Sequence, residues 1–231
     1  MPPVAALAFA ALCASPARAQ EAGPHADTAI YTDFPTSVGV RTTVELPSRL
    51  RLSLGGGLLP DAYLASIQRV ATGAGWYSKE LATVIDTALS RAFVIQPKLG
   101  WRPWEDRGYF FGVGYQRVIA VGGEAGAAEV AAGVDGVGGG TDYFLKSQLR
   151  MATIEAGHEW PVKDRLVVRA SLGGAVTLGA STVAEEVADE EARLDRLRAA
   201  GRDVLEAYLN DTYTRYVHTP TVGIEVGWRF L

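Results

Sequence analysis

The chain has 231 residues, of which 48% are hydrophobic, and its 22 Lys and Arg against 26 Asp and Glu give a formal net charge of −4. This length fits one domain, and the lack of a basic excess argues against a nucleic-acid-binding protein. No apolar run reaches the roughly 18 residues that a membrane-spanning helix needs. A membrane β-barrel remains open, because only alternate residues of its strands face lipid.

Residues 1–19 are predicted to be a cleaved export signal. The apolar stretch Val4–Cys13 is too short to span a bilayer, and Ala17-Arg18-Ala19 has the small-x-small pattern of a cleavage site, so the mature chain would begin at Gln20. Cleavage would remove Cys13, the only cysteine, and would leave 21 basic against 26 acidic residues, a net charge of −5. The alternative interpretation is a buried N-terminal segment.

Two-residue alternation of apolar and polar side chains, repeated along the chain, predicts β-strands. In each run one face is aliphatic or aromatic, while the other carries glycine with charged and amide side chains. The runs lie at 37–46, 50–58, 92–104, 111–116, 145–155, 166–178 and 222–230. Between 152 and 155 the alternation loses its phase, which predicts a β-bulge. An eighth strand is predicted at 28–34, turning at Pro35-Thr36, because bacterial single-chain barrels use even strand numbers.

The charged side chains on the glycine-rich face of each predicted strand help to distinguish a soluble β-protein from a membrane β-barrel. In a soluble sandwich they would form the solvated surface, whereas in a small membrane barrel they would line the lumen and pair with one another. Leu145, Leu149 and Met151 are then expected on the lipid-facing side of their strand. We expect a lumen ionic network of Arg41, Glu45, Arg51, Lys98, Arg102, Lys146, Arg150, Arg169, Glu225 and Arg229.

Loop lengths, strand lengths and aromatic residues favour the membrane barrel. Short links alternate strictly with long ones, so that all the long links fall at one end, as in barrels with short periplasmic turns and long external loops. Several predicted strands have about ten residues, enough to cross a bilayer at a tilt. Aromatic side chains near strand ends resemble an interfacial girdle. They are Trp101, Trp104, Tyr109, Phe110, Trp160, Trp228 and Phe230.

The long links carry helical periodicity. In the first, Asp61 is predicted to cap one helix and Ser78 another that ends near Arg91. The middle link, 122–140, is rich in glycine and alanine and is expected to be flexible.

A third helix is predicted over Thr182–Leu209, and a break at Gly201 is left open. These helices would either pack on the barrel rim or, in the case of the third, form an exposed docking surface for a partner.

The C-terminal strand carries a more specific pattern. It places Val226, Trp228 and Phe230 on one face, and Leu231 follows the last aromatic residue. This resembles the terminal strand of small bacterial outer-membrane barrels, the class that includes OmpX and the membrane domain of OmpA. The resemblance covers about residues 27–231. It implies that these three residues form an assembly signal read by the barrel-assembly machinery, and that the protein lies in the outer membrane of a Gram-negative cell envelope.

Motifs for catalysis or metal binding are weak. The chain has three histidines, His25, His158 and His218, and His25 is assigned to the N-terminal tail. They lack the spacing of convergent metal ligands, so no metal site or cofactor is predicted. Nucleophilic catalysis needs a base within hydrogen-bond reach of a hydroxyl. Some outer-membrane barrels act on lipid in this way, and His218 with Ser181 or Thr182 could be arranged so near the membrane rim.

The sequence therefore predicts a signal peptide at 1–19 and, at 20–231, an all-β protein: an eight-stranded antiparallel transmembrane β-barrel with helical insertions at about 60–91 and 182–209. Side chains fill a lumen of this size, so the leading hypothesis is a non-enzymatic, structural or surface-contact role. The alternatives are a membrane-embedded lipid-modifying enzyme and a soluble secreted lipocalin-like barrel with its aliphatic face inside. The expected partners are outer-membrane lipid, the barrel-assembly machinery and an unknown partner at the external helices.

Overall fold

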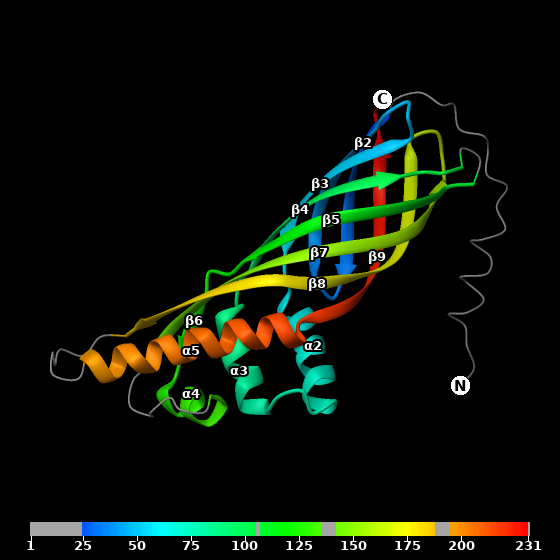
Figure 1. Ribbon diagram of the computed structural model, residues 1–231. Coiled ribbons are helices and arrows are strands. Elements are labelled where there is room, and N and C mark those ends of the chain that lie inside the picture. The colour runs from blue at the N-terminus through cyan, green and yellow to red at the C-terminus, as the bar shows by residue number, and fades with distance from the viewer. Residues whose placement is uncertain (1–24, 105–106, 135–141, 188–194, 231) are drawn as a thin grey trace.

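Antiparallel strands close into a barrel in the computed structural model (Figure 1). The structure describes residues 25–104, 107–134, 142–187 and 195–230. The predicted signal segment 1–19 lies outside these residues. Within the described part, eight strands form the ring, because β5 pairs with β7 and β1 pairs with both β2 and β9. They are β1 (His25–Phe34), β2 (Ser37–Glu45), β3 (Leu50–Leu58), β4 (Phe93–Trp101), β5 (Tyr109–Ile119), β7 (Tyr143–Pro161), β8 (Leu166–Glu186) and β9 (His218–Arg229).

The ring confirms the eight-stranded antiparallel barrel, including the weakly patterned first strand, which begins three residues before the predicted position at Thr28. Closure leaves no ring strand with an unpaired edge, as a sheet in hydrocarbon requires, since lipid offers no hydrogen-bond partners to the backbone. β6 (Gly123–Ala125) lies outside the ring and pairs with β7.

The two ends of the barrel differ. The links 46–49 and 162–165 lie at one end together with the ends of β4 and β9 and the start of β5, while all labelled helices lie at the other (Figure 1). The tight β1–β2 turn is also at the helical end, where the backbone N–H of Thr36 donates to the Asp33 carbonyl (2.6 Å). Short turns at one end and long insertions at the other confirm the predicted asymmetry.

The first long link forms α2 (Asp61–Gly73) and α3 (Lys79–Ala88). Ser78 caps α3 as predicted, since its side chain accepts a hydrogen bond from the backbone N–H of Leu81 (3.1 Å). For α2 the cap prediction is wrong, because Pro60 occupies the N-cap position. Asp61 lies in the first turn, where its negative charge interacts favourably with the positive end of the helix dipole. No helix in the described part of the chain is long and apolar enough to cross a membrane.

The second and third long links differ from the predictions. Part of the link expected to be flexible forms β6 and α4 (Ala127–Gly133), and its residues 135–141 lie outside the described part. The third helix, α5, spans Asp195–Tyr216 and passes through Gly201 unbroken. Residues 182–186, predicted to be helical, instead continue β8, because their side chains also alternate with strand period and pair with β7.

β7 and β8 are 19 and 21 residues long and extend beyond the barrel towards the helices (Figure 1). We call this part of the molecule the cap: α2, α3, α4, α5 and β6 with the outer halves of β7 and β8. The hydroxyl of Ser147 on β7 lies 3.1 Å from that of Tyr213 on α5. The cap has an apolar core that includes Leu59, Leu81, Ile85, Val130, Leu145, Leu149, Met151, Leu205 and Leu209.

The polarity of the sheet inverts along β7. In the barrel its inward positions carry Glu155 and Glu159, whereas in the cap they carry Met151, Leu149 and Leu145. The inversion coincides with a register shift between Arg150 and Met151, close to the bulge predicted at 152–155. Leu145, Leu149 and Met151 are therefore covered by cap helices and do not face lipid, which corrects the sequence-based placement.

Candidate functional site

The barrel lumen is the most strongly organised polar site in the molecule. In the described residues the lumen holds six carboxylates and six cations, so its formal net charge is zero. The carboxylates belong to Asp27, Asp33, Glu45, Glu155, Glu159 and Glu225, and the cations to Arg41, Arg51, Lys98, Arg102, Arg169 and Arg229.

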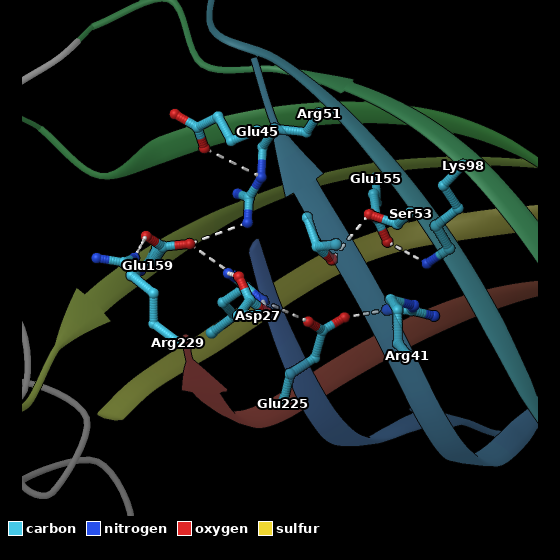
Figure 2. A network of polar contacts seen from close by, with 12 residues as sticks. Asp27, Arg41, Glu45, Arg51, Ser53, Lys98, Glu155, Glu159, Glu225 and Arg229 are labelled. Carbon is cyan, nitrogen blue, oxygen red and sulfur yellow. Dashed lines mark hydrogen bonds and ion pairs between the residues drawn. The ribbon is translucent and has the colours of Figure 1, made fainter. Parts of the chain in front are cut away.

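Glu159 is the centre of the group nearest the short turns (Figure 2). Its two oxygens accept hydrogen bonds from Arg169 (2.6 Å), Arg102 (2.8 Å), Arg51 (2.9 Å) and Arg229 (3.1 Å). Because the Glu159 side chain is only 1% exposed, one carboxylate neutralises part of the charge of four guanidinium groups away from bulk water.

A second group lies deeper in the barrel, around Asp33. Arg41 donates to Asp33 (2.6 Å) and to the amide oxygen of Gln96 (2.7 Å), and it also pairs with Glu225. Lys98 bridges Asp33 (3.2 Å) and Glu155 (2.6 Å). These contacts join strands β1, β2, β4, β7 and β9 across the lumen.

Arg169 connects the two groups. Beside its bond to Glu159, its Nη1 donates to Asp27 (2.8 Å) and to Glu225 (3.3 Å). Glu225 in turn contacts Arg41 of the deeper group. The twelve charged side chains thus form one connected network along the barrel axis.

The network fills the lumen. Among the cavities, the one between Arg41, Lys98, Arg169 and Glu225 has a volume of about 20 Å³, enough for about one water molecule. Burying so many charges is costly unless each one is paired and hydrogen-bonded. The lumen meets the pairing requirement by matching cations to carboxylates, although buried polar atoms of Glu45, Arg51 and Arg102 have no hydrogen-bond partner among the described residues. This cavity is too small for a hydrated ion.

The structure places eight of the ten residues expected in the lumen network inside the barrel. They are Arg41, Glu45, Arg51, Lys98, Arg102, Arg169, Glu225 and Arg229. Lys146 and Arg150 are exposed on the outer surface of β7, which corrects their assignment. The reason is the inversion of β7: in the cap its inward positions pack on helices, so its charged residues face out.

Four lumen carboxylates were missed: Asp27, Asp33, Glu155 and Glu159. Asp27 and Asp33 belong to the weakly patterned β1, whose inward set is polar at both ends. Glu155 and Glu159 share one face of β7, and their place on that face was hidden because the alternation changes polarity a few residues earlier. A requirement of charge balance would have pointed to them, since eight of the ten expected lumen residues were cations.

The outward face of the barrel is aliphatic and aromatic. Ile30, Leu54 and Leu172 are 70%, 61% and 67% exposed, although each lies in the middle of a strand. The soluble lipocalin-like alternative required the reverse arrangement, so the structure rules it out. The short-turn end carries exposed Trp101 and Trp228, as an interfacial girdle does. Phe110, Trp104, Tyr109, Trp160 and Phe230 were predicted with them, and of these Phe110 instead faces inwards.

The residues considered for catalysis are not brought together. His218 pairs in register with Val176, and its Nδ1 accepts a long hydrogen bond from the backbone N–H of Thr177 (3.4 Å). Ser181 is five residues further along β8, a distance of about 16 Å at strand spacing. Thr182 is buried, and its hydroxyl lies 2.9 Å from that of Ser147.

The other two histidines contact a carboxylate in one case and aromatic rings in the other. His25 is buried at the start of β1 with its Nε2 3.6 Å from Glu45, so it does not belong to a tail as predicted. His158 lies between the rings of Tyr109 and Trp160, at centroid distances of 4.7 and 4.5 Å. Over the described residues, no three His, Cys, Asp or Glu side chains converge as metal ligands.

Comparisons with known proteins add two distant likenesses. No family model and no curated protein matches the sequence. Similar solved structures include CarO of Acinetobacter baumannii, with 12% identity over 89% of this chain and 97% of that one, at a TM-score of 0.35. A major outer membrane protein from Thermus thermophilus has 12% identity over 89% of this chain and 99% of that one, at a TM-score of 0.42.

The class of the protein follows from the barrel itself. Charged residues fill the interior, aliphatic residues face outwards, the ring has no free edge, and short turns oppose long insertions. Each feature is what a hydrocarbon environment imposes on a single-chain bacterial barrel. The chain is an eight-stranded transmembrane β-barrel, with the architecture that bacterial outer-membrane barrels have.

Proposed function

We propose that this protein is a non-enzymatic structural component of the outer membrane, in which a sealed barrel anchors a helical cap on the outer side for contact with a partner. The observation that carries the proposal is the lumen, in which six cations are matched to six carboxylates around a cavity that holds about one water. A barrel filled in this way serves as a rigid anchor and not as a pore.

The cap supports a role in contact. It is joined to the barrel by two strands, β7 and β8, that run from one part into the other. α5 packs on β8 through Leu205 and Leu209, and the rest of its surface exposes Val204, Ala207 and Tyr208. This exposed face, which combines apolar and charged side chains, is the part of the cap that we propose for partner contact.

The catalytic alternative has less support, since His218 and Ser181 lie far apart along the sheet and Thr182 is already hydrogen-bonded inside the cap. Assembly by the barrel-assembly machinery is part of the proposal. Val226 and Trp228, on the outward face of β9, and Phe230, just after it, are each about half exposed, so that a receptor could read them.

Planar-bilayer recordings of the refolded protein test whether the lumen is sealed. We expect no discrete conductance steps, with insertion verified independently by heat-dependent mobility on SDS gels. Incubation with labelled phospholipid, followed by mass spectrometry, tests for catalysis and should yield no lipid product. Regular conductance steps would contradict the anchor role, and lipid products that disappear in His218→Ala would favour the enzyme.

Surface labelling of intact cells tests where the cap lies. Ala207→Cys on α5 should react with a membrane-impermeant maleimide, whereas Ser48→Cys, in a short turn at the opposite end, should react only after the cells are lysed. The comparison is clean if Cys13 is removed with the signal. The opposite labelling pattern would place the cap in the periplasm and refute the proposed surface role.

A further inference from the structure

The outward surface of β7 changes from uncharged to charged at Arg150. From the short-turn end, its successive outward positions are Trp160, His158, Ala156, Ile154 and Ala152, followed by Arg150, Gln148 and Lys146. The neighbouring strand β5 changes at the same level, because Arg117 pairs in register with Arg150 and Tyr115 with Ala152.

This level corresponds to the outer boundary of the hydrocarbon. Ten residues separate Trp160 from Arg150, a rise of about 33 Å along an extended strand. At the usual tilt of about 40°, this covers about 25 Å of membrane thickness, the height of the apolar band of such barrels. The inversion of β7 agrees, because from Met151 outwards apolar residues face the cap core and polar ones face out. Arg117 and Arg150 therefore lie at the depth of the lipid headgroups.

The two arginines lack the carboxylates that accompany every cation in the lumen. Like charges directly opposite each other destabilise a strand pair, yet over residues 25–104, 107–134, 142–187 and 195–230 no ion pair involves Arg117 or Arg150. The exposed Glu185 lies further from the barrel on β8, opposite Phe144. The positive charge of this pair is thus free to attract an anion from outside.

Both guanidinium groups are held at the surface. Arg117 donates to the amide oxygen of Gln148 (2.8 Å). Arg150 lies across β8 over Gly179, where an added Cβ would be 3.4 Å from its Nη2. The register shift beside Arg150 brings Gly179 opposite it, so the bulge and the glycine together leave room for this side chain.

We propose that Arg117 and Arg150 bind the phosphate groups of lipids in the outer leaflet. Planar guanidinium groups match phosphate oxygens with paired hydrogen bonds, and each basic residue near a membrane surface strengthens the binding of anionic lipid about fivefold. Directly below, Tyr115 and Ala152 offer an uncharged surface for the acyl chains of the same molecule. The ligand is therefore a phosphorylated lipid, and the site is separate from the lumen and from the α5 contact face.

The test uses the whole protein refolded into phosphatidylcholine vesicles that contain a small fraction of bisphosphorylated lipid A. After transfer to nanodiscs, native mass spectrometry counts the lipid A that remains bound. Arg117→Gln/Arg150→Gln should bind about 25-fold more weakly, from about fivefold for each arginine. The matched control is Lys163→Gln/Arg165→Gln, which removes two exposed cations from the β7–β8 turn at the opposite end and should bind like the unaltered protein.

Removal of the phosphates from lipid A should weaken binding as much as the double substitution does. Equal binding by the double variant and the control would overturn the proposal. The proposal would also be overturned if inorganic phosphate bound to the detergent-solubilised protein with the same dependence on both arginines, because the ligand would then be a free anion. If the double variant loses its heat-dependent gel mobility, Arg150→Gln alone keeps the test, with a loss of about fivefold. A negative result leaves the conductance and labelling tests of the anchor role unaffected.

Discussion

Replacement of Glu159 by glutamine should be among the most damaging isosteric substitutions in the lumen. The change removes one negative charge and almost no volume, so any loss of stability is electrostatic. Glu159 accepts hydrogen bonds from Arg51, Arg102, Arg169 and Arg229. Without it, Arg51 and Arg102 are left with Glu45, and Arg169 with Asp27 and Glu225, as ion-pair partners among the described residues.

Removing one partner of a buried ion pair costs about 3–5 kcal/mol, because the remaining charge stays buried and unpaired. We expect Glu159→Gln to lower the free energy of unfolding by about this amount, a large fraction of the roughly 5–15 kcal/mol that stabilises a typical domain. Urea titration in phospholipid vesicles, followed by tryptophan fluorescence, measures the change. The matched control is Glu185→Gln, the same substitution at an exposed position of β8, which should cost about 0.5 kcal/mol or less.

A second substitution separates electrostatics from packing. In Glu159→Gln/Arg102→Gln one cation leaves together with the carboxylate, so the double variant should be less destabilised than the sum of the two single variants. A loss below about 1 kcal/mol for Glu159→Gln, or strict additivity of the pair, would refute the view that charge balance holds the lumen together.

Three further predictions concern other parts of the molecule. Gly57→Ala should destabilise the barrel by about 1–3 kcal/mol in urea titrations, because the new methyl group would lie 2.3 Å from the carbonyl oxygen of Val38 on β2; an unchanged midpoint would contradict this. Phe230→Ala should reduce the amount of folded barrel in cells while leaving refolding in detergent unchanged, and equal losses in both assays would argue against an assembly signal. Burial raises the pKa of Asp86 on α3, because the partly buried site favours the neutral carboxyl group over the charged carboxylate. The folded state is therefore most stable with respect to this group below about pH 4, and it loses that stability as pH rises through the raised pKa. Asp86→Asn should therefore stabilise the cap at neutral pH and not in acid, as hydrogen exchange of α3 amides would show, and an equal effect at both pH values would rule out this cause.

Much of the barrel could be predicted from the sequence because its signals are local. Alternation with a period of two fixes which residues of a strand share a face, and charged residues among glycines mark a face that cannot meet lipid. Arg41, Glu45 and Arg51 were placed inside on this basis, and the structure has them there. Ser78 was identified as a helix cap because that signal depends on its own side chain and the next turn.

The predictions failed where the meaning of a face depends on distant parts of the chain. Lys146 and Arg150 alternate in the same way whether the other face of β7 is covered by lipid or by α5, and α5 lies some fifty residues further along the chain. In the same way, residues 182–186 fit a helix by composition, yet pairing with β7 makes them a strand. A strand pattern shows that two faces differ, but not which of them is covered.

The sequence by itself determined the class, the strand order and the contrast between a charged and an apolar face, because these depend on spacing along one strand and on the lengths of the links. Only the tertiary structure decided which charges meet, that the lumen is neutral and filled, and where the sheet inverts its polarity. These depend on closure of the ring and on the docking of α5, which bring together side chains as far apart in sequence as Arg41 and Glu225. A pattern within one strand does not show that Arg41 and Glu225 lie close together in space.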